Sequence, residues 1–459
     1  MKDLTKGNEA SLIIVFALPM LIGNVFQQFY NMVDSWVVGR YVGTTALAAV
    51  GAATPIIFLV IALAMGVTMG ANVLIAQFYG AKDEKRIRTM IDTTYIALFF
   101  TSLLVTVVGV FTVGPLLTLL RIPEEVWPEA TTYLRIIMAG LLFTFGYNGV
   151  GAILRGLGDS MTPLYMLILS TLINITLDLV FVRVFSWGVT GVALATVIAQ
   201  AVSFIASLVY LNLTHPVLRT NFLKLSFNSE MFRQSLAIGV PSGLQQALAS
   251  LGGMFMSAVI NGYGTAVIAG FATANRIELL AGMPAMNIGM ALSAFTGQNI
   301  GAGKMDRVKR GFHAALLIGV ALTIVIMTGM FIFARHIIGF FTDDLAVIAV
   351  GVQYLQVMSP LFFLFTIMFT TNGLIRGAGE GIVPMVSTLL ATWAARIPCA
   401  LLFSHFWGVI GLWFASPAGW ILGDIIVLSY YKSQRWTKKS FTATAASDKI
   451  RTQEAGHDR

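Results

Sequence analysis

The stretch that decides the fold occurs twice in the chain. It reads Ile153-Leu154-Arg155-Gly156-Leu157-Gly158-Asp159 and, 221 residues later, Leu374-Ile375-Arg376-Gly377-Ala378-Gly379-Glu380. The same offset carries other residues to identical partners: Pro163 to Pro384, Gln77 to Gln298, Gly80 to Gly301 and Ala81 to Ala302. With a shift of one residue it also carries Pro19 to Pro241. Agreement at a near-constant offset in so many places indicates two related halves.

The sequence around these motifs is strongly apolar. The chain has 459 residues, of which 57% are hydrophobic and 11% charged, whereas soluble domains carry about 25% charged residues. A membrane-spanning helix needs roughly 20 mostly apolar residues. Segments of this kind recur along the chain, and the expected spans are 11–39, 47–77, 92–116, 130–153, 164–184, 189–211, 232–260, 267–298, 311–333, 350–374, 384–404 and 408–431. The composition therefore predicts an all-α membrane protein.

Each half of the repeat contains six of these expected spans. Because six is even, both halves enter the membrane with the same polarity, as in transporters whose halves enclose a central cavity. We predict twelve transmembrane helices in two parallel pseudo-symmetric six-helix bundles. The predicted parts are an N-terminal six-helix lobe (1–211), a cytoplasmic linker (212–231), a C-terminal six-helix lobe (232–431) and a basic cytoplasmic tail (432–459) that we expect to be mobile.

The basic residues predict the orientation. The net charge of +8 could suggest nucleic acid, but the Lys and Arg residues lie in loops beside the spans and in the tail. If the N-terminus is inside, 22 of the 29 Lys and Arg residues are inside as well. This asymmetry predicts a multi-pass protein of the cell (inner or plasma) membrane with both termini cytoplasmic, and no nucleic-acid partner.

Four acidic residues lie well inside the expected spans: Asp34, Asp178, Glu278 and Asp424. An acid at the bilayer centre costs roughly 2.5–3.5 kcal/mol on insertion scales, so each needs a partner or a function. With a rise of about 1.5 Å per residue, Asp34, Asp178 and Thr196 fall at a similar depth in the outer half of the N-terminal bundle. Asn174 precedes Asp178 by four residues and shares its helix face. These four residues are predicted to form one buried polar cluster.

Such a cluster can carry ion coupling. Burial and a nearby like charge both favour the neutral form of a carboxyl group. The pair Asp34 and Asp178 could therefore load and release a proton, or bind Na⁺ together with Asn174 and Thr196. The alternative is a polar network that only holds helices together. Two acids at one depth, with no Lys or Arg expected there, favour the coupling site.

Other polar residues and prolines in the spans are candidates for supporting roles. Pro19 lies 15 residues before Asp34 and frees one backbone carbonyl, so it is either a static kink or a hinge. Candidate cavity-lining residues are Gln27, Gln28, Asn31, Gln245, Gln246, Arg276 and Glu278. Arg276 and Glu278 are two residues apart and do not face each other, so each should have a partner elsewhere. Asp424 is interpreted as a solvated helix end, and Arg396 is given no role.

No cofactor is expected. Gly301-Ala302-Gly303-Lys304 resembles a phosphate-binding loop, but Gln298 replaces its first glycine and Met305 its Ser or Thr, and no strand precedes it. The five histidines are scattered and give no metal-ligand pattern. Transport by this chain would therefore be driven by an ion gradient, with H⁺ or Na⁺ as the coupling ion.

Several of these motifs together resemble the multidrug and toxic compound extrusion family, across nearly the whole chain up to the tail. They are Pro19 with Asn31-Met32-Val33-Asp34, the helix ends Gln77-x-x-Gly80-Ala81 and Gln298-x-x-Gly301-Ala302, and the paired Arg-Gly-x-Gly motifs. Asn174-x-x-x-Asp178 and Thr196 are similar to the N-lobe ion site of the DNA-damage-inducible (DinF-like) branch. The other branch uses an acid in helix seven, whereas Gln234 to Ile260 contains none.

The resemblance implies a secondary transporter, not an enzyme. It implies export of organic cations and hydrophobic drugs in exchange for H⁺ or Na⁺ by alternating access, with protonation of Asp34 accompanied by bending at Pro19. Related flippases of lipid-linked precursors or polysaccharides share the fold, so a lipid substrate is the alternative; a structural or channel-like role is a third. The expected partners are small cationic or hydrophobic molecules and membrane lipids, and the expected state is a monomer.

Overall fold

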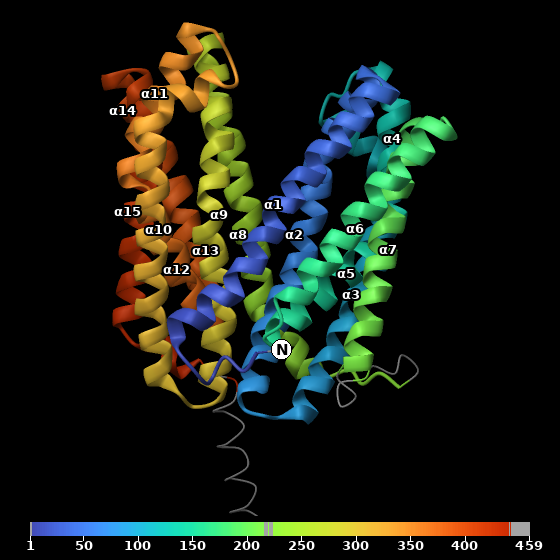
Figure 1. Cartoon of the computed structure of the whole chain (residues 1–459), viewed down its shortest axis with the longest axis vertical. Helices are drawn as coiled ribbons and strands as arrows, with labels where there is room; N and C mark the ends of the chain where they lie inside the picture. Colours follow the sequence, from blue (N-terminus) through green and yellow to red (C-terminus); the bar gives the residue numbers. More distant parts are fainter. Residues whose placement is uncertain (1, 215–218, 220–223, 440, 442–459) are drawn as a thin grey trace, which may run out of the picture. The chain divides into compact units, whose positions relative to one another are not determined.

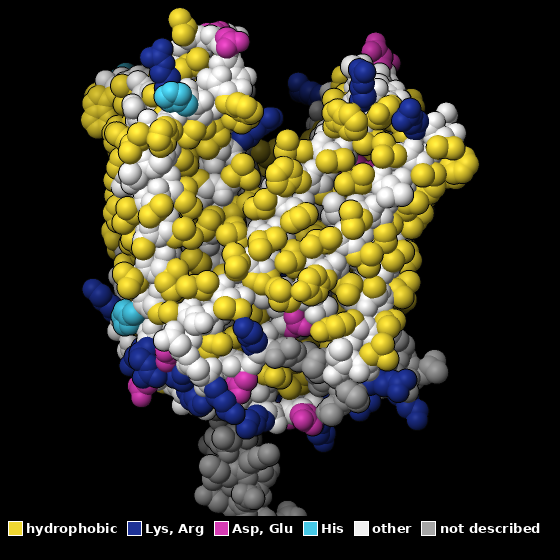
Figure 2. All heavy atoms as spheres, viewed as in Figure 1, with side chains coloured by type: hydrophobic (Ala, Val, Ile, Leu, Met, Phe, Trp, Pro, Cys, Tyr) yellow, Lys and Arg dark blue, Asp and Glu magenta, His cyan; other side chains and the backbone are white. Residues whose placement is uncertain are grey.

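The computed structural model describes all residues except 1, 215–218, 220–223, 440 and 442–459. The described part is made of helices joined by short turns, and it contains no strand. Long helices follow one another along the chain in both halves (Figure 1). Hydrophobic side chains cover their middle portions, and the charged side chains gather near the helix ends (Figure 2). This distribution is expected of helices that cross a bilayer.

The helices of the two halves correspond. The first half contains α1 (Glu9–Val37), α2 (Thr44–Gly80), α3 (Glu84–Leu119), α4 (Trp127–Ala139), α5 (Leu141–Gly156), α6 (Met161–Leu179) and α7 (Gly188–Thr214). The second half contains α8 (Ser229–Ile260), α9 (Thr265–Gly301), α10 (Met305–Gly339), α11 (Leu345–Met358), α12 (Phe363–Gly377), α13 (Ile382–Leu389), α14 (Ile397–Trp407) and α15 (Val409–Lys432). Three π-helical turns extend or join them: Val38–Val42, Val180–Val184 and Leu390–Arg396.

The described residues provide ten helices long and apolar enough to cross a membrane, and two bent helix pairs complete a set of twelve. The bent pairs are α4 with α5, at 51°, and α11 with α12, at 52°. The predicted all-α membrane fold with six spans in each half is confirmed, but the two bends were not predicted. The first bend is at Gly140, which has no side chain where Val197 packs against it. The second follows Pro360, which lacks a backbone N–H donor.

The contacts divide the chain into two compact units. The N-terminal unit contains Met1–Lys2 and Ile22–Gly239, and the C-terminal unit contains Asp3–Leu21 and Val240–Arg459. The predicted lobes differ from these units at two helices. The start of α1 belongs to the C-terminal unit, and the start of α8 belongs to the N-terminal unit. Each division lies within three residues of a proline inside the helix, Pro19 in α1 and Pro241 in α8.

Small residues let helices approach closely in the N-terminal unit. A β-carbon added at Gly239 of α8 would lie 1.6 Å from the carbonyl oxygen of Gly66 in α2. One added at Gly70 would lie 2.0 Å from the carbonyl oxygen of Ser235. In a membrane protein, helix association depends on close packing of this kind. The start of α8 is therefore held against α2 at a crossing that no larger residue would permit.

The amino-terminal segment is anchored within the C-terminal unit. Leu4 is 1% exposed and joins a core cluster with Ile13, Phe16 and residues of α9 and α10. Its backbone N–H donates to Gln298 Oε1 at 3.0 Å, and its carbonyl accepts from Asn299 Nδ2 at 3.1 Å. Because these contacts satisfy its backbone, the segment is a fixed part of the fold.

Two expectations about the C-terminal end are corrected. The beginning of the predicted mobile tail is ordered: Arg435–Lys438 forms a short 3₁₀ helix, and Trp436 is fully buried and stacks on Tyr431. Residue 440 and residues 442–459 of the tail lie outside the described part. Asp424 is 6% exposed and packs within the C-terminal unit, so it is not a solvated helix end.

Candidate functional site

The site begins with the two carboxyl-bearing helices of the N-terminal unit. Asp34 lies three residues before the end of α1, and Asp178 lies one residue before the end of α6. Each helix continues into a π-helical turn, and these two turns contact each other. π-Helical turns occur frequently at functional sites. The fold therefore brings together two acids that are separated by more than a hundred residues in the sequence.

The four predicted cluster residues meet in the structure. The carboxyl groups of Asp34 and Asp178 lie close enough to interact with each other. With the Asn174 amide oriented to satisfy both of its ends, its nitrogen donates to Asp178 Oδ2 at 2.9 Å. Its oxygen then accepts from the backbone N–H of Thr196 at 3.3 Å. The contacts link α1, α6 and α7.

Two tyrosines complete this cluster and were not predicted. The Tyr30 hydroxyl lies 3.5 Å from the Thr196 hydroxyl, and Tyr133 of α4 interacts electrostatically with both carboxyl groups. Tyr30 precedes Asp34 by four residues, and this spacing on one helix face was the available signal. Tyr133 follows Glu129 of α4 by four residues, but Glu129 lies outside the expected span 130–153, so only the packing of α4 identifies Tyr133.

Burial makes the cluster sensitive to a proton or a cation. Asp178 is fully buried and Asn174 is 1% exposed. One oxygen of each carboxyl group, Asp34 Oδ1 and Asp178 Oδ1, has no hydrogen-bond partner among the described residues. An unpartnered buried carboxylate oxygen is costly, and the cost falls when a proton or cation binds it. The carboxylate, amide and hydroxyl oxygens present here are ligands of the type that hard cations prefer.

The remaining predicted residues of α1 lie on the same helix as Asp34. Pro19 is buried inside α1, two residues before the boundary between the compact units. Gln27, Gln28 and Asn31 are exposed along the following turns. No described contact ties these three polar side chains to the cluster, so their predicted contact with a substrate stays a prediction.

The predicted residues of the C-terminal unit form two other groups. Gln245 is 8% exposed; it donates to Thr388 Oγ1 at 2.7 Å and accepts from Arg376 Nη2 at 2.7 Å. Its amide is therefore committed to a buried network, whereas Gln246 is half-buried and Arg276 is exposed.

Glu278 does not face Arg276, which is two residues away, and it has a partner on another helix, as predicted. It accepts a hydrogen bond from the Tyr354 hydroxyl and interacts electrostatically with Arg396. Both Asp424 oxygens and Arg396 Nε are buried without a partner among the described residues. In the same part of the chain, no group of three or more His, Cys, Asp and Glu side chains is arranged to hold a metal ion.

The fold and this buried acid pair define a polytopic membrane protein with an intramembrane polar cluster. The family model MatE matches residues 19–180 and, separately, residues 241–402. The chain therefore belongs to the MatE family, the multidrug and toxic compound extrusion proteins that its motifs resemble. The two matches also confirm the internal repeat, and they begin at Pro19 and Pro241.

Known relatives span the chain almost completely. It is 30% identical over 441 residues to the probable multidrug resistance protein YpnP of Bacillus subtilis (strain 168), covering 96% of this chain and 99% of the relative. It is 26% identical to the probable multidrug resistance protein NorM of Thermotoga maritima, covering 93% of each. A crystal structure of MATE in the bent conformation matches with a TM-score of 0.89 at 24% identity, covering 96% of this chain and 98% of the other.

Proposed function

We propose that this protein is a secondary multidrug efflux antiporter of the cell membrane. It exports organic cations and hydrophobic drugs in exchange for H⁺ or Na⁺ by alternating access. Support for export comes from MatE family membership and from relatives described as multidrug resistance proteins. The observation that carries ion coupling is the pair of Asp34 and Asp178, each with one buried oxygen that has no partner among the described residues.

The cluster has two states that differ in charge and contacts. When both carboxyl groups are ionised, they repel each other, and each needs donors from Asn174, Thr196 or Tyr30. When a proton is bound, one carboxyl group donates to the other and releases a neighbouring donor. A Na⁺ ion would bridge the same oxygens. Because α1, α6 and α7 all contribute, the bound ion alters how these helices pack.

Pro19 is the proposed hinge that responds to this change. Proline removes one backbone hydrogen bond from α1. The compact units divide α1 two residues further on, so its beginning and end pack in different units. A change in the packing of the Asp34 end can therefore alter the bend while the first turns stay in place. Ion binding would shift the population of two conformations in this way.

The direct test is transport in proteoliposomes that contain only this protein. Ethidium efflux is followed under an imposed pH gradient, an imposed sodium gradient, and neither. We expect efflux to require one of the two gradients and to collapse when that gradient is dissipated. Efflux that needs no gradient would reject the antiporter, and movement of a fluorescent lipid without movement of ethidium would support the flippase alternative.

A further inference from the structure

The bent spans of the two halves differ in what fills the bend. Met138, just before the bend in the N-terminal unit, corresponds by the 221-residue offset to Ser359 in the C-terminal unit. Met138 is 1% exposed, and a β-carbon at Gly109 of α3 would lie 2.8 Å from its sulfur. The Thr106 hydroxyl donates to the Met138 carbonyl at 2.8 Å. The N-terminal bend is therefore packed tightly.

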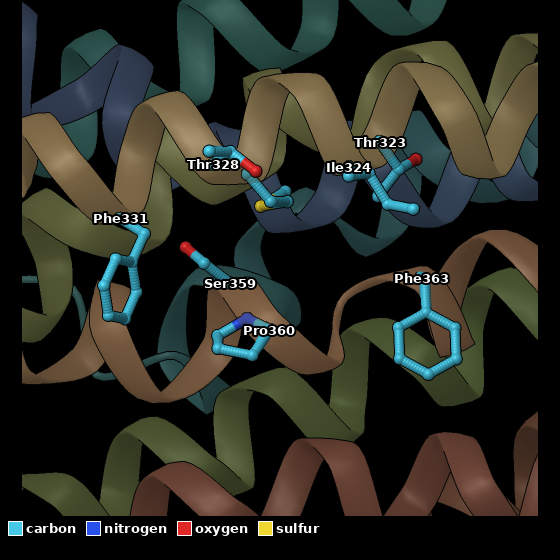
Figure 3. A pocket seen from close by; sticks show the side chains of 8 residues that line it. Thr323, Ile324, Thr328, Phe331, Ser359, Pro360 and Phe363 are labelled. Atoms are coloured by element: carbon cyan, nitrogen blue, oxygen red, sulfur yellow. The ribbon is translucent and has the colours of Figure 1, made fainter.

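In the C-terminal unit the smaller Ser359 takes the place of Met138, and the buried Met330 takes the place of Gly109. A cavity of about 270 Å³ lies between α10 and the bend, lined by Thr323, Ile324, Met327, Thr328, Phe331, Ser359, Pro360 and Phe363. Figure 3 shows the α10 side chains on one side and Ser359, Pro360 and Phe363 on the other. Met327, the counterpart of Thr106, has no side-chain hydroxyl to reach across. We call this space the α10–α12 groove.

The lining combines an apolar surface with two hydroxyl groups that have no partner among the described residues, the exposed one of Thr328 and the buried one of Ser359. The apolar contacts are aromatic or flexible side chains, namely Phe331, Phe363, Ile324 and Met327. Ser359 is 5% exposed, and its buried hydroxyl has no hydrogen-bond partner among the described residues. Its oxygen points toward α10 in Figure 3. A pure hydrocarbon chain would leave this hydroxyl unpaired, which is unfavourable in an apolar environment.

The groove opens on an exposed apolar face of α10. In the described residues α10 packs against α9, α11 and α12 and the turn Ser359–Leu361. Its exposed side chains over the apolar span include Ile324, Val325, Phe331 and Ile332. An exposed apolar face on a membrane-spanning helix contacts the hydrocarbon core. A ligand would reach the groove from the bilayer.

We propose that the α10–α12 groove binds a compact, bilayer-dissolved aromatic molecule that carries one hydroxyl or carbonyl group. The cavity, at about 270 Å³, is slightly smaller than the roughly 300–1,000 Å³ of typical small-molecule sites, so the ligand is small. The aromatic body packs between Phe331 and Phe363, and its polar group pairs with the Ser359 hydroxyl. The groove lies within one compact unit and uses none of the coupling residues.

The test uses the full chain in phosphatidylcholine nanodiscs and two photoreactive probes. One is trifluoromethyl-diazirinyl benzyl alcohol, and the other is trifluoromethyl phenyl diazirine, which lacks the alcohol. After irradiation, labelled peptides are quantified by mass spectrometry. We expect the alcohol to label the groove residues well above exposed apolar positions elsewhere, such as Phe111, and to be displaced by unlabelled benzyl alcohol. Uniform labelling of all lipid-facing positions would overturn the proposal.

Matched variants distinguish the contribution of the Ser359 hydroxyl to binding from that of the cavity volume. Ser359→Ala keeps the cavity and should reduce labelling by the alcohol roughly two- to tenfold, as loss of one hydrogen bond predicts, without changing labelling by the other probe. Ser359→Met should abolish groove labelling by both probes, whereas Met138→Ser should create labelling at the N-terminal bend. Unchanged labelling in Ser359→Ala would overturn the role of the hydroxyl, even if Ser359→Met failed to fold.

Discussion

At the scale of single residues, the central feature is the pair of Asp34 and Asp178. They are far apart in the sequence, yet their carboxyl groups interact in the folded structure. Asn174 and Thr196 hold one side of the pair, and within the described part of the chain each carboxyl group keeps one unpartnered oxygen. This arrangement can accept a proton or cation without moving a charged side chain into water. Substitutions that keep shape and remove charge are therefore the informative ones.

We expect Asp34→Asn and Asp178→Asn each to abolish gradient-driven ethidium efflux while leaving the protein folded and inserted. An amide preserves the shape of the side chain but cannot exchange a proton. The measurement is efflux in proteoliposomes, with size-exclusion chromatography as the folding control. Wild-type efflux rates in either variant would remove that residue from the coupling site.

Asn174→Ala and Thr196→Ala should cause smaller losses, because neither residue titrates. Each removes contacts that position the carboxyl pair, at a cost of about 1–3 kcal/mol for an unsatisfied buried partner. We expect slower efflux that still depends on the gradient. The measurement is again ethidium efflux in proteoliposomes. A loss of efflux as complete as in Asp178→Asn would mean that Asn174 or Thr196 binds the ion itself.

At the scale of helices, α1 and α8 are the elements that belong to both compact units. Each contains a proline close to the point where the units divide, and each begins one repeat of the family model. Asp34 is on α1, whereas the membrane part of α8 has no acid. The two helices therefore form a natural comparison for the proposed hinge.

In Pro19→Ala the acid cluster should still titrate, but its protonation should change drug affinity less than in the wild type. A continuous helix has no weak point at which to bend. Drug affinity is measured against pH in detergent: wild type should bind cations more weakly as the cluster protonates, by roughly 5–150-fold for a coupling of 1–3 kcal/mol. Asp34→Asn should flatten the pH dependence.

Pro241→Ala is the matched control, because α8 carries no titrating partner. This variant should retain the wild-type dependence of drug affinity on pH. A wild-type slope in Pro19→Ala would show that Pro19 is a static kink, and a slope lost equally in both variants would show a general effect of removing a proline.

Gly239→Ala should destabilise the protein by disrupting the crossing of α2 and α8. The added carbon would meet the Gly66 carbonyl at 1.6 Å, so the backbones must separate. Overpacking typically costs about 1–3 kcal/mol, which should lower the apparent Tm in detergent. Gly253→Ala on the same helix meets no atom within 4 Å and should leave Tm unchanged or slightly raised. Equal Tm values for the two variants would contradict the close crossing.

At the scale of the whole molecule, the expected topology places both termini in the cytoplasm. Residues 84 and 306 lie at equivalent turns of the two halves, at the starts of α3 and α10. In a Cys399→Ser background, single cysteines at these positions should resist an impermeant thiol reagent in intact cells. They should react after permeabilisation. Labelling of either position from outside would reject the topology.

The sequence alone determined the number of spans, the repeat and four of the six residues of the acid cluster. Hydropathy reports how each segment partitions into a bilayer, and the offset of motifs reports the duplication; both are properties of local sequence. Asp34, Asn174, Asp178 and Thr196 could be grouped because an acid in a span is costly and depth follows from helical rise. Their proximity is now visible, and their ion-coupling role stays a prediction.

Only the tertiary structure decided which side chains have partners and where helices bend. Gln245 is tied to Thr388 and Arg376, Asp424 is buried, and Tyr133 lies beside the acid pair. The division of α1 and α8 between units and the open space at Ser359 were equally absent from local patterns. The physical reason is that burial, pairing and cavities depend on contacts between residues far apart in the chain, whereas hydropathy and periodicity describe one segment at a time.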